Sequence, residues 1–301
     1  MITRVATFAM SERMLEASLR TQSRMSEAQL QQASGAVSTD YGGLGRSAGT
    51  LVSLEVSLAR SKSQSSAAEE AGNRVQVMYD AVGSMSELMS SFRTSLSSAI
   101  SAGGDGDATL AATAQSLLEE FASLLNTRFE GRYLFAGSDT GTAPIDLSAY
   151  AATDAATQDT SYYQGNSVKA SVALSSERTL TYGVTGDASA FEQALRALSA
   201  VANATTPPDT ETLQAISDLT VDAIDQLAVV QAKLSIDAAT LERSTAAQAD
   251  YQDEATSLIS AINGADVTAI AVELSSYETQ LQASYSALAK VQSLNLMDYL
   301  N

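Results

Sequence analysis

The closing stretch of the chain, Val267 to Asn301, reads VTAIAVELSSYETQLQASYSALAKVQSLNLMDYLN. Apolar or aromatic side chains recur in it at alternating steps of four and three residues. They are Ile270, Leu274, Tyr277, Leu281, Leu288 and Val291, and Ser284 takes the one polar place in the series. A 4-3 repeat keeps one stripe on one side of a helix, as in a coiled coil. We therefore expect residues 266–301 to form a helical arm with these six residues as its assembly seam.

The composition favours helix in the rest of the chain as well. Only three of the 301 residues are proline, 45% are hydrophobic and 6% are aromatic. Few prolines leave long helical runs uninterrupted. Few aromatics point to thin seams between helices rather than to one thick core.

The residue types that are missing exclude several functions. The chain has no cysteine and no histidine, so it has no disulfide, no thiolate or imidazole metal ligand, and no Ser-His-Asp triad. Paired carboxylates such as Glu69-Glu70 and Glu119-Glu120 are adjacent, and adjacent residues point to different sides of a helix. We expect no enzyme, no cofactor and no metal site.

The net charge of −18 is spread unevenly. Residues 1–45 carry four arginines and four carboxylates, and residues 266–301 carry one lysine and four carboxylates, so −15 falls between them. Near-neutral ends suit burial in an assembly, and an acidic middle suits a solvated surface. The charge also argues against nucleic acid or an anionic membrane as partners, because both require clustered basic residues.

Hydrophobic periodicity predicts helices separated by a small antiparallel β-rich insert. Helices are expected over 11–32, 51–100, 110–125, 191–201 and 206–262, and strands over 132–136, 162–165, 168–174 and 179–185. The fold is thus mainly α, a long antiparallel helical bundle or coiled coil built from both halves of the chain. The predicted parts are an N-terminal arm that pairs with the C-terminal one (1–45 with 266–301), two halves of a helical rod (46–135 and 187–265), and the insert (136–186).

Capping residues suggest where the helices begin. Ser11, Thr206 followed by Pro207, and Asp266 are the expected starts of three of them. The first helix has a thin apolar stripe and is marginal alone. It is either a surface helix or one stabilised by packing on the C-terminal helix. Its stripe consists of Met14, Leu15, Leu19, Met25 and Leu30.

Two glycine-rich stretches resemble ligand-binding motifs without meeting their requirements. Gly43 to Ala48 matches the dinucleotide fingerprint in form, but helices flank it where a strand should precede it, so we interpret it as a flexible joint. Gly103 to Asp107 resembles a calcium nonapeptide but is not repeated. A turn in which Asp107 caps the next helix is the better interpretation.

The N-terminal residues MITRVATFAMSERMLEAS lack the apolar segment of a secretory signal peptide. No apolar run approaches the ~20 residues of a membrane span. If the protein leaves the cytoplasm, we expect a route without a cleaved signal.

Three stretches of the chain resemble the flagellin superfamily of bacterial axial proteins, and within it the hook–filament junction family. They are Leu125 to Gly137 (LNTRFEGRYLFAG), Leu281 to Leu300 with its LQASY and SLNLMDYL ends, and Leu30 to Gly35 (LQQASG). The third departs from the family pattern at Ala36, where a basic residue is usual, and in the glycines after Asp40.

The resemblance implies a structural subunit of the flagellum that joins hook to filament for motility. It implies that the terminal helices pair as a coiled coil in the core of a hollow structure, with the insert outside. The implied partners are further copies in a ring, a neighbouring hook-associated protein, flagellin, and an export chaperone that holds the C-terminal helix. Export through the flagellar type III apparatus, to a position outside the cell, is implied as well.

Other functions remain open on the sequence alone. A flagellin, the filament subunit itself, is the main alternative. An enzyme is disfavoured by the missing residue types. A secreted coiled-coil effector or adhesin would require a host-binding surface that the sequence does not reveal.

Overall fold

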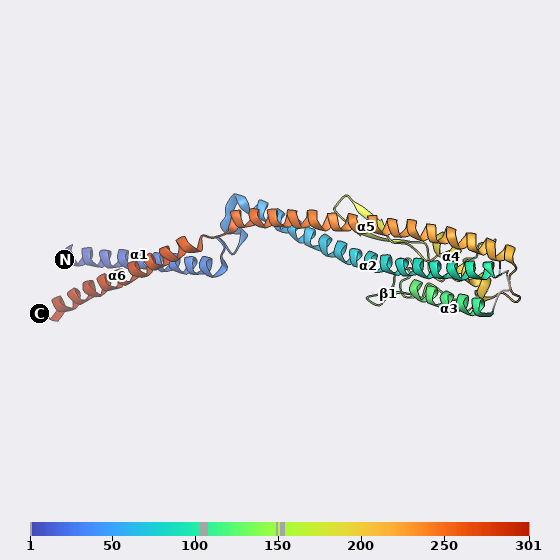
Figure 1. Ribbon diagram of the computed structural model, residues 1–301. Coiled ribbons are helices and arrows are strands. Elements are labelled where there is room, and N and C mark those ends of the chain that lie inside the picture. The colour runs from blue at the N-terminus through green and yellow to red at the C-terminus, as the bar shows by residue number, and fades with distance from the viewer. Residues whose placement is uncertain (1, 103–107, 149, 151–153, 301) are drawn as a thin grey trace. The chain divides into compact units, whose positions relative to one another are not determined.

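The computed structural model describes residues 2–102, 108–148, 150 and 154–300, and helices dominate it (Figure 1). The α-helices are α1 (Ile2–Ser34), α2 (Ala48–Ser101), α3 (Ala108–Leu125), α4 (Ser189–Ala202), α5 (Thr210–Asn263) and α6 (Val267–Leu300). A 3-10 helix, η1 (Tyr41–Ser47), precedes α2. The prediction of a mainly α fold with antiparallel long helices and a small β insert is confirmed.

The strands are shorter than predicted. β1 (Arg128–Phe129) pairs with β2 (Arg132–Tyr133), and β3 (Ala170–Ala173) pairs with β4 (Thr179–Tyr182), both antiparallel. The strand expected at 162–165 is wrong, because that segment forms only an isolated bridge between Tyr163 and Ile145. Outside these short ladders, single backbone hydrogen bonds connect segments of the insert, such as the one from the Asn166 N–H to the Ala136 carbonyl at 3.1 Å.

The capping predictions have mixed outcomes. Asp266 does cap α6, since its Oδ1 accepts from the N–H groups of Thr268 and Ala269, each at 3.0 Å. Ser11 does not begin α1, which starts at Ile2. The helix predicted from Thr206 begins at Thr210 instead, where Asp209 Oδ1 accepts from the Thr212 N–H at 2.9 Å. The predicted turn at Gly103–Asp107, with its Asp107 cap, lies outside the described residues.

The chain folds into two compact units. The terminal unit comprises residues 1–60 and 251–301, and the central unit comprises residues 61–250. Within the part of the chain that the structure describes, no helix is both long and apolar enough to cross a membrane.

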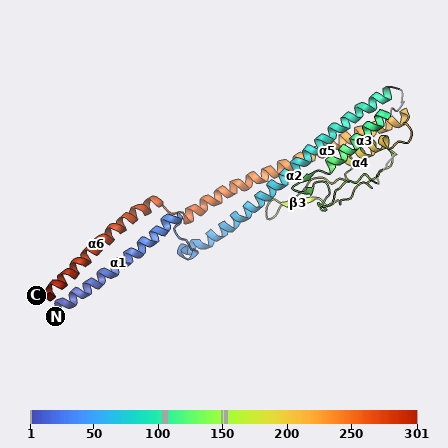
Figure 2. The ribbon, with the colours of Figure 1, turned by 90° about the horizontal axis from the view of Figure 1, so that it is seen from below.

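The central unit has a continuous hydrophobic core. α2 and α5 run side by side, and α3 and α4 lie alongside them (Figures 1 and 2). The largest fully buried side chains of this core include Phe92, Phe121, Phe135, Phe191, Met85 and Tyr162. The Phe135 and Phe191 rings meet edge to face with centroids 5.6 Å apart, a favoured aromatic geometry. Aromatic side chains thus fill the space between the helices of the central unit.

The middle of α2 carries small residues that allow α5 to approach closely. Ser61, Ser65 and Ala68 are buried there. The Ser61 hydroxyl donates to the Gln248 Oε1 at 2.6 Å, which links α2 directly to α5. Beside them, an open groove of about 510 Å³ is lined by small side chains and by the carboxylates of Glu69 and Glu242.

Candidate assembly interface

The terminal helices pair with each other inside the terminal unit. α1 and α6 lie antiparallel and side by side in both views (Figures 1 and 2). Ala28 of α1 is buried in one cluster with Ile270 and Leu274 of α6, and Met25 and Tyr277 pack against this cluster. The pairing joins residues about 240 positions apart in the sequence.

The structure places all six residues of the predicted seam on the side of α6 with reduced exposure. Ile270, Leu274 and Leu281 are buried. Tyr277, Leu288 and Val291 are partly buried. The burial decreases toward the chain end, and the side chains beyond Val291 are not described.

Where its side chains are described, the side of α1 that faces α6 combines methionines with small and hydroxyl-bearing residues and carries no leucine. Along α1, reduced exposure recurs at Met14, Ser18, Thr21, Met25 and Ala28, at steps of four and three. The Ser18 hydroxyl donates to the Met14 carbonyl at 2.9 Å, and the Thr21 hydroxyl bonds within its own helix in the same way. Because these hydroxyls are satisfied locally, they can be covered at small cost and let α6 approach closely.

The predicted apolar stripe of α1 is divided between two sides of the helix. Met14 and Met25 lie on the α6 side, but Leu15, Leu19 and Leu30 are 49%, 56% and 62% exposed. At 3.6 residues per turn these leucines lie within about 60° of one another and Leu19 is about 120° from Met25. Of the predicted stripe, Met25 packs against the α6 cluster, while the three leucines, which we name the outer stripe, stay exposed.

Leucines aligned on one exposed helix face are costly in water unless they serve an interface. α6 also exposes large apolar side chains, Val272 at 69% and Tyr285 at 52%. The α1/α6 pair thus buries one seam inside the chain and leaves further apolar surface exposed.

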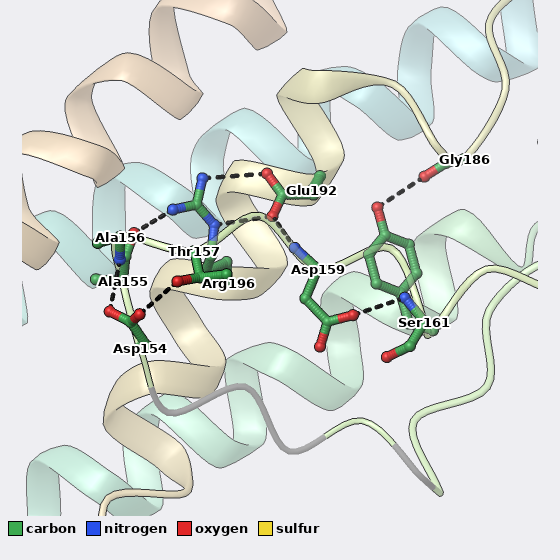
Figure 3. Close-up of polar contacts among 10 residues, drawn as sticks. Asp154, Ala155, Ala156, Thr157, Asp159, Ser161, Gly186, Glu192 and Arg196 are labelled. Carbon is green, nitrogen blue, oxygen red and sulfur yellow. Dashed lines mark hydrogen bonds and ion pairs between the residues drawn. The ribbon is translucent and has the colours of Figure 1, made fainter.

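A buried ion pair in the central unit is the other conspicuous cluster (Figure 3). Arg196 of α4 donates through Nε to Glu192 Oε1 at 2.8 Å and through Nη2 to Oε2 at 3.2 Å. The Asp159 N–H donates to the same Glu192 carboxylate at 3.0 Å, and Arg196 also donates to the Ala155 carbonyl. The pair therefore anchors the loop around residues 155–159 onto α4.

Further contacts around this ion pair are also internal. Asp154 accepts from the Thr157 hydroxyl and the Ala156 N–H, and these hydrogen bonds lower the pKa of its carboxyl (Figure 3). The Tyr162 hydroxyl donates to the Gly186 carbonyl at 3.1 Å, and burial raises the pKa of that phenol. The contacts described for this cluster are thus all internal to the central unit and stabilise the insert.

Sequence reasoning missed the Glu192–Arg196 pair because a charged i, i+4 pair usually lies on a solvated face. The signal was its surroundings, since almost every other residue from Ala190 to Val201 is apolar. A charge on a helix without a polar face must be paired in the core.

The stretch that resembles a dinucleotide fingerprint behaves as a structural element. Residues Gly43–Ser47 lie in η1, where Asp40 Oδ1 accepts from the Gly43 N–H at 2.9 Å and Gly45 adopts φ 54°. The residues before η1 form a bridge and bends, not the strand that a dinucleotide site requires. In the described part of the chain, no three acidic side chains gather as a metal site would need.

Comparison with known proteins finds a family model that is similar to the C-terminal part of the chain. Residues 218–300 match the family model described as the bacterial flagellin C-terminal helical region. This match confirms, for these residues, the resemblance carried by the closing motif. A comparison with curated protein sequences gives no match.

Solved structures extend the likeness to the fold. A Vibrio parahaemolyticus protein assigned as flagellar hook-associated is similar with a TM-score of 0.57 at 16% identity, over 71% of this chain and 96% of that one. FlgL of Bacillus cereus aligns with a TM-score of 0.43 at 15% identity, over 70% of this chain and 96% of that one. Because the identity is only 16%, the similarity to the Vibrio structure shows a shared fold and nothing more.

Proposed function

We propose that the chain is a structural subunit of the bacterial flagellum that joins the hook to the filament and performs no catalysis. The observation that carries this proposal is the α1/α6 pair, which buries one seam and exposes the outer stripe of Leu15, Leu19 and Leu30. The flagellin-type C-terminal helices and the fold shared with a protein assigned as hook-associated support it.

In this proposal the parts of the chain have separate tasks. The arms, 1–45 and 266–301, pair through Ile270, Leu274, Tyr277, Leu281, Leu288 and Val291 and then contact further copies in a ring. The rod halves, 46–135 and 187–265, form the body, and residues 136–186 form an outer insert. The subunit contacts a neighbouring hook-associated protein on one side and flagellin on the other, outside the cell.

The seam also fits an export chaperone. Before α6 pairs with α1, the buried side chains of Ile270, Leu274 and Leu281 would be exposed to water, where they favour aggregation. A chaperone that covers this stripe during export would remove that hazard.

The location of the protein tests the proposal. Isolated hook–filament structures are labelled with an antibody against the central unit and viewed by electron microscopy. We expect label only in a narrow band at the joint between hook and filament. No label on these structures would overturn the flagellar role.

A flagellin is the second candidate, and the match of residues 218–300 to the flagellin C-terminal region favours it. Label along the entire filament would identify it. The purified chain offers an independent test, because a flagellin polymerises alone into long filaments and a junction subunit stops at short assemblies.

A further inference from the structure

The two linkers that lead to the terminal helices are tied to each other by hydrogen bonds. Ala36 and Gly264 form an antiparallel bridge. The Ala265 N–H donates to the Gly35 carbonyl at 2.9 Å, and the Val37 N–H donates to the Asn263 carbonyl at 2.8 Å. We name residues 35–38 and 263–265 the linker clasp, and all of them belong to the terminal unit.

Side chains reinforce the linker clasp on both strands. Asn263 Oδ1 accepts from the Ser38 N–H at 3.0 Å, which joins residues 225 positions apart. Gln31 Nε2 donates to the Val37 carbonyl at 2.8 Å, so the end of α1 holds the same linker. Five backbone groups therefore have partners that depend on one relative position of the two linkers: the N–H groups of Val37, Ser38 and Ala265 and the carbonyls of Gly35 and Asn263.

Glycines make this geometry specific. Gly35 ends α1 with φ +67°, a conformation that other residues rarely adopt. At Gly264 a Cβ atom would lie 2.3 Å from the Ser260 carbonyl oxygen, which is far inside van der Waals contact. Even a methyl group at position 264 would therefore displace the backbone of the linker clasp.

The linker clasp lies directly beside the first contacts of the α1/α6 seam. Ala265 packs against the cluster of Ala28, Ile270 and Leu274. Asp266 then caps α6. The backbone bridge and the first buried seam residues are thus continuous, and together they fix where α6 begins relative to the end of α1.

The seam alone specifies register weakly. A slip of seven residues, about 10 Å along a helix, keeps a heptad stripe facing its partner. On α1 such a slip exchanges Ala28 for Thr21, which are both small, so packing at this buried position discriminates little between the two registers. It also exchanges Met25, which packs against the cluster, for Ser18. The linker clasp cannot survive a slip of about 10 Å, because every hydrogen bond between the two linkers would be lost.

We propose that the linker clasp sets the register of α1 against α6 and makes the two terminal helices one body before any assembly. The clasp closes a loop of more than 200 residues, so it forms once the central unit has brought the linkers together. The inference concerns the isolated chain and does not depend on the flagellar role.

Disulfide trapping tests the register, because the natural chain contains no cysteine. The pair Ala28→Cys with Leu274→Cys reports the register of the structure, since both positions lie in one buried cluster. The pair Thr21→Cys with Leu274→Cys reports the register slipped by seven residues. In the otherwise natural chain we expect the first pair to oxidise at least about tenfold faster, since losing even one or two hydrogen bonds disfavours the slipped state by such a factor.

The variants Gly264→Ala and Asn263→Ala are then combined with each cysteine pair. We expect the ratio of the two oxidation rates to fall below about threefold. Gly264→Ala displaces the backbone of the linker clasp, and Asn263→Ala removes the side-chain acceptor of the Ser38 N–H. Gly49→Ala is the matched control, since a Cβ there meets nothing within 4 Å. It should leave the preference unchanged.

Each result decides the proposal. Gly264→Ala could also abolish both cross-links while circular dichroism shows that its helix content is retained and Gly49→Ala still forms them. This result would support the proposal as well, because the pairing of α1 with α6 would then depend on the linker clasp. An unchanged preference in both Gly264→Ala and Asn263→Ala would overturn it. Equal rates for the two cysteine pairs in the natural chain would overturn it as well.

Discussion

The terminal and central units are both built from long antiparallel helices with small residues in their seams, yet their cores differ in kind. The central unit buries Phe92, Phe121 and Phe191 completely among helices that lie in more than one layer. The α1/α6 pair buries one small cluster around Ala28, Ile270 and Leu274. A two-helix pair covers only one side of each helix, so its outer faces stay in water until a further partner covers them.

The difference shows which unit is stabilised by its own core and which unit leaves apolar surface exposed for assembly. Burial of a Leu or Phe side chain contributes about 1.5–3 kcal/mol, and ordering a residue costs about 1–2 kcal/mol in backbone entropy. The central unit has many buried side chains for its length, and the terminal pair has few. We therefore expect the central unit to stand alone and the terminal pair to gain much of its order from partners.

The largest effect is expected from Phe191→Ala in the central unit. The ring is fully buried and meets Phe135 edge to face, so its removal leaves a cavity. Urea unfolding followed by circular dichroism should show the free energy of unfolding of the central unit lowered by about 3–5 kcal/mol. Val229→Ala, at a position 62% exposed, is the control and should change little. A loss for Phe191→Ala no greater than that of the control would contradict the contrast between the units.

Glu192→Ala is expected to lower the free energy of unfolding of the central unit by about 3 kcal/mol, because it leaves the buried Arg196 guanidinium without its carboxylate. Thermal unfolding measures the loss. The double variant Glu192→Leu with Arg196→Leu removes both charges and should recover part of it. If the double variant loses as much free energy of unfolding as the two single variants lose together, the destabilisation does not come from breaking the ion pair.

Leu274→Ala should weaken the terminal pair and leave the central unit intact. We expect a loss of about 2–3 kcal/mol in the α1/α6 contact, so that a pair with so small a core opens more often but still forms. Hydrogen exchange followed by mass spectrometry should show faster exchange in residues 9–34 and 265–291 and unchanged exchange in 61–250. The matched control is Leu258→Ala, since Leu258 is 43% exposed. Equal acceleration in both units would show that they do not unfold separately.

Alkaline pH gives a smaller effect, confined to the central unit. Burial raises the pKa of Tyr150 and Tyr162, so their phenols stay protonated in the folded chain. This stabilisation is complete below pH ~10, the ordinary tyrosine pKa, and is lost as pH rises above it. Urea midpoints of the central unit should therefore fall above about pH 10, and less so in Tyr162→Phe. A midpoint independent of pH up to about 11 would argue against this burial.

Much of the fold was predictable because local chemistry marks it. The heptad steps of the closing stretch and the Asp266 cap place α6 where the structure has it. Thr206 misled because two prolines follow it and the helix begins only at Thr210, under the Asp209 cap. The strands of the insert were overestimated because alternation indicates extended chain but not whether a neighbouring strand exists to pair with.

The candidate interface was only half predictable. Met14 and Leu15 are adjacent and differ by about 100° around α1, and composition alone does not say which of them faces α6. Packing decides this, because α6 brings the larger side chains to the seam and leaves room there for Ser18 and Ala28. The leucines are therefore displaced to the outside. Only the three-dimensional pairing distinguishes the seam inside the chain from the outer stripe.

The central claim is that the outer stripe on α1 is a contact between subunits, and Leu19→Asp tests it most directly. Leu19 is 56% exposed, so the purified variant should unfold as the natural chain does. Cells that carry the variant in place of the natural gene are examined by electron microscopy for filaments retained on hooks. We predict loss of attached filaments with Leu19→Asp and normal numbers with the control Val168→Asp, an equally exposed site in the insert. Normal filament numbers with Leu19→Asp would contradict the account.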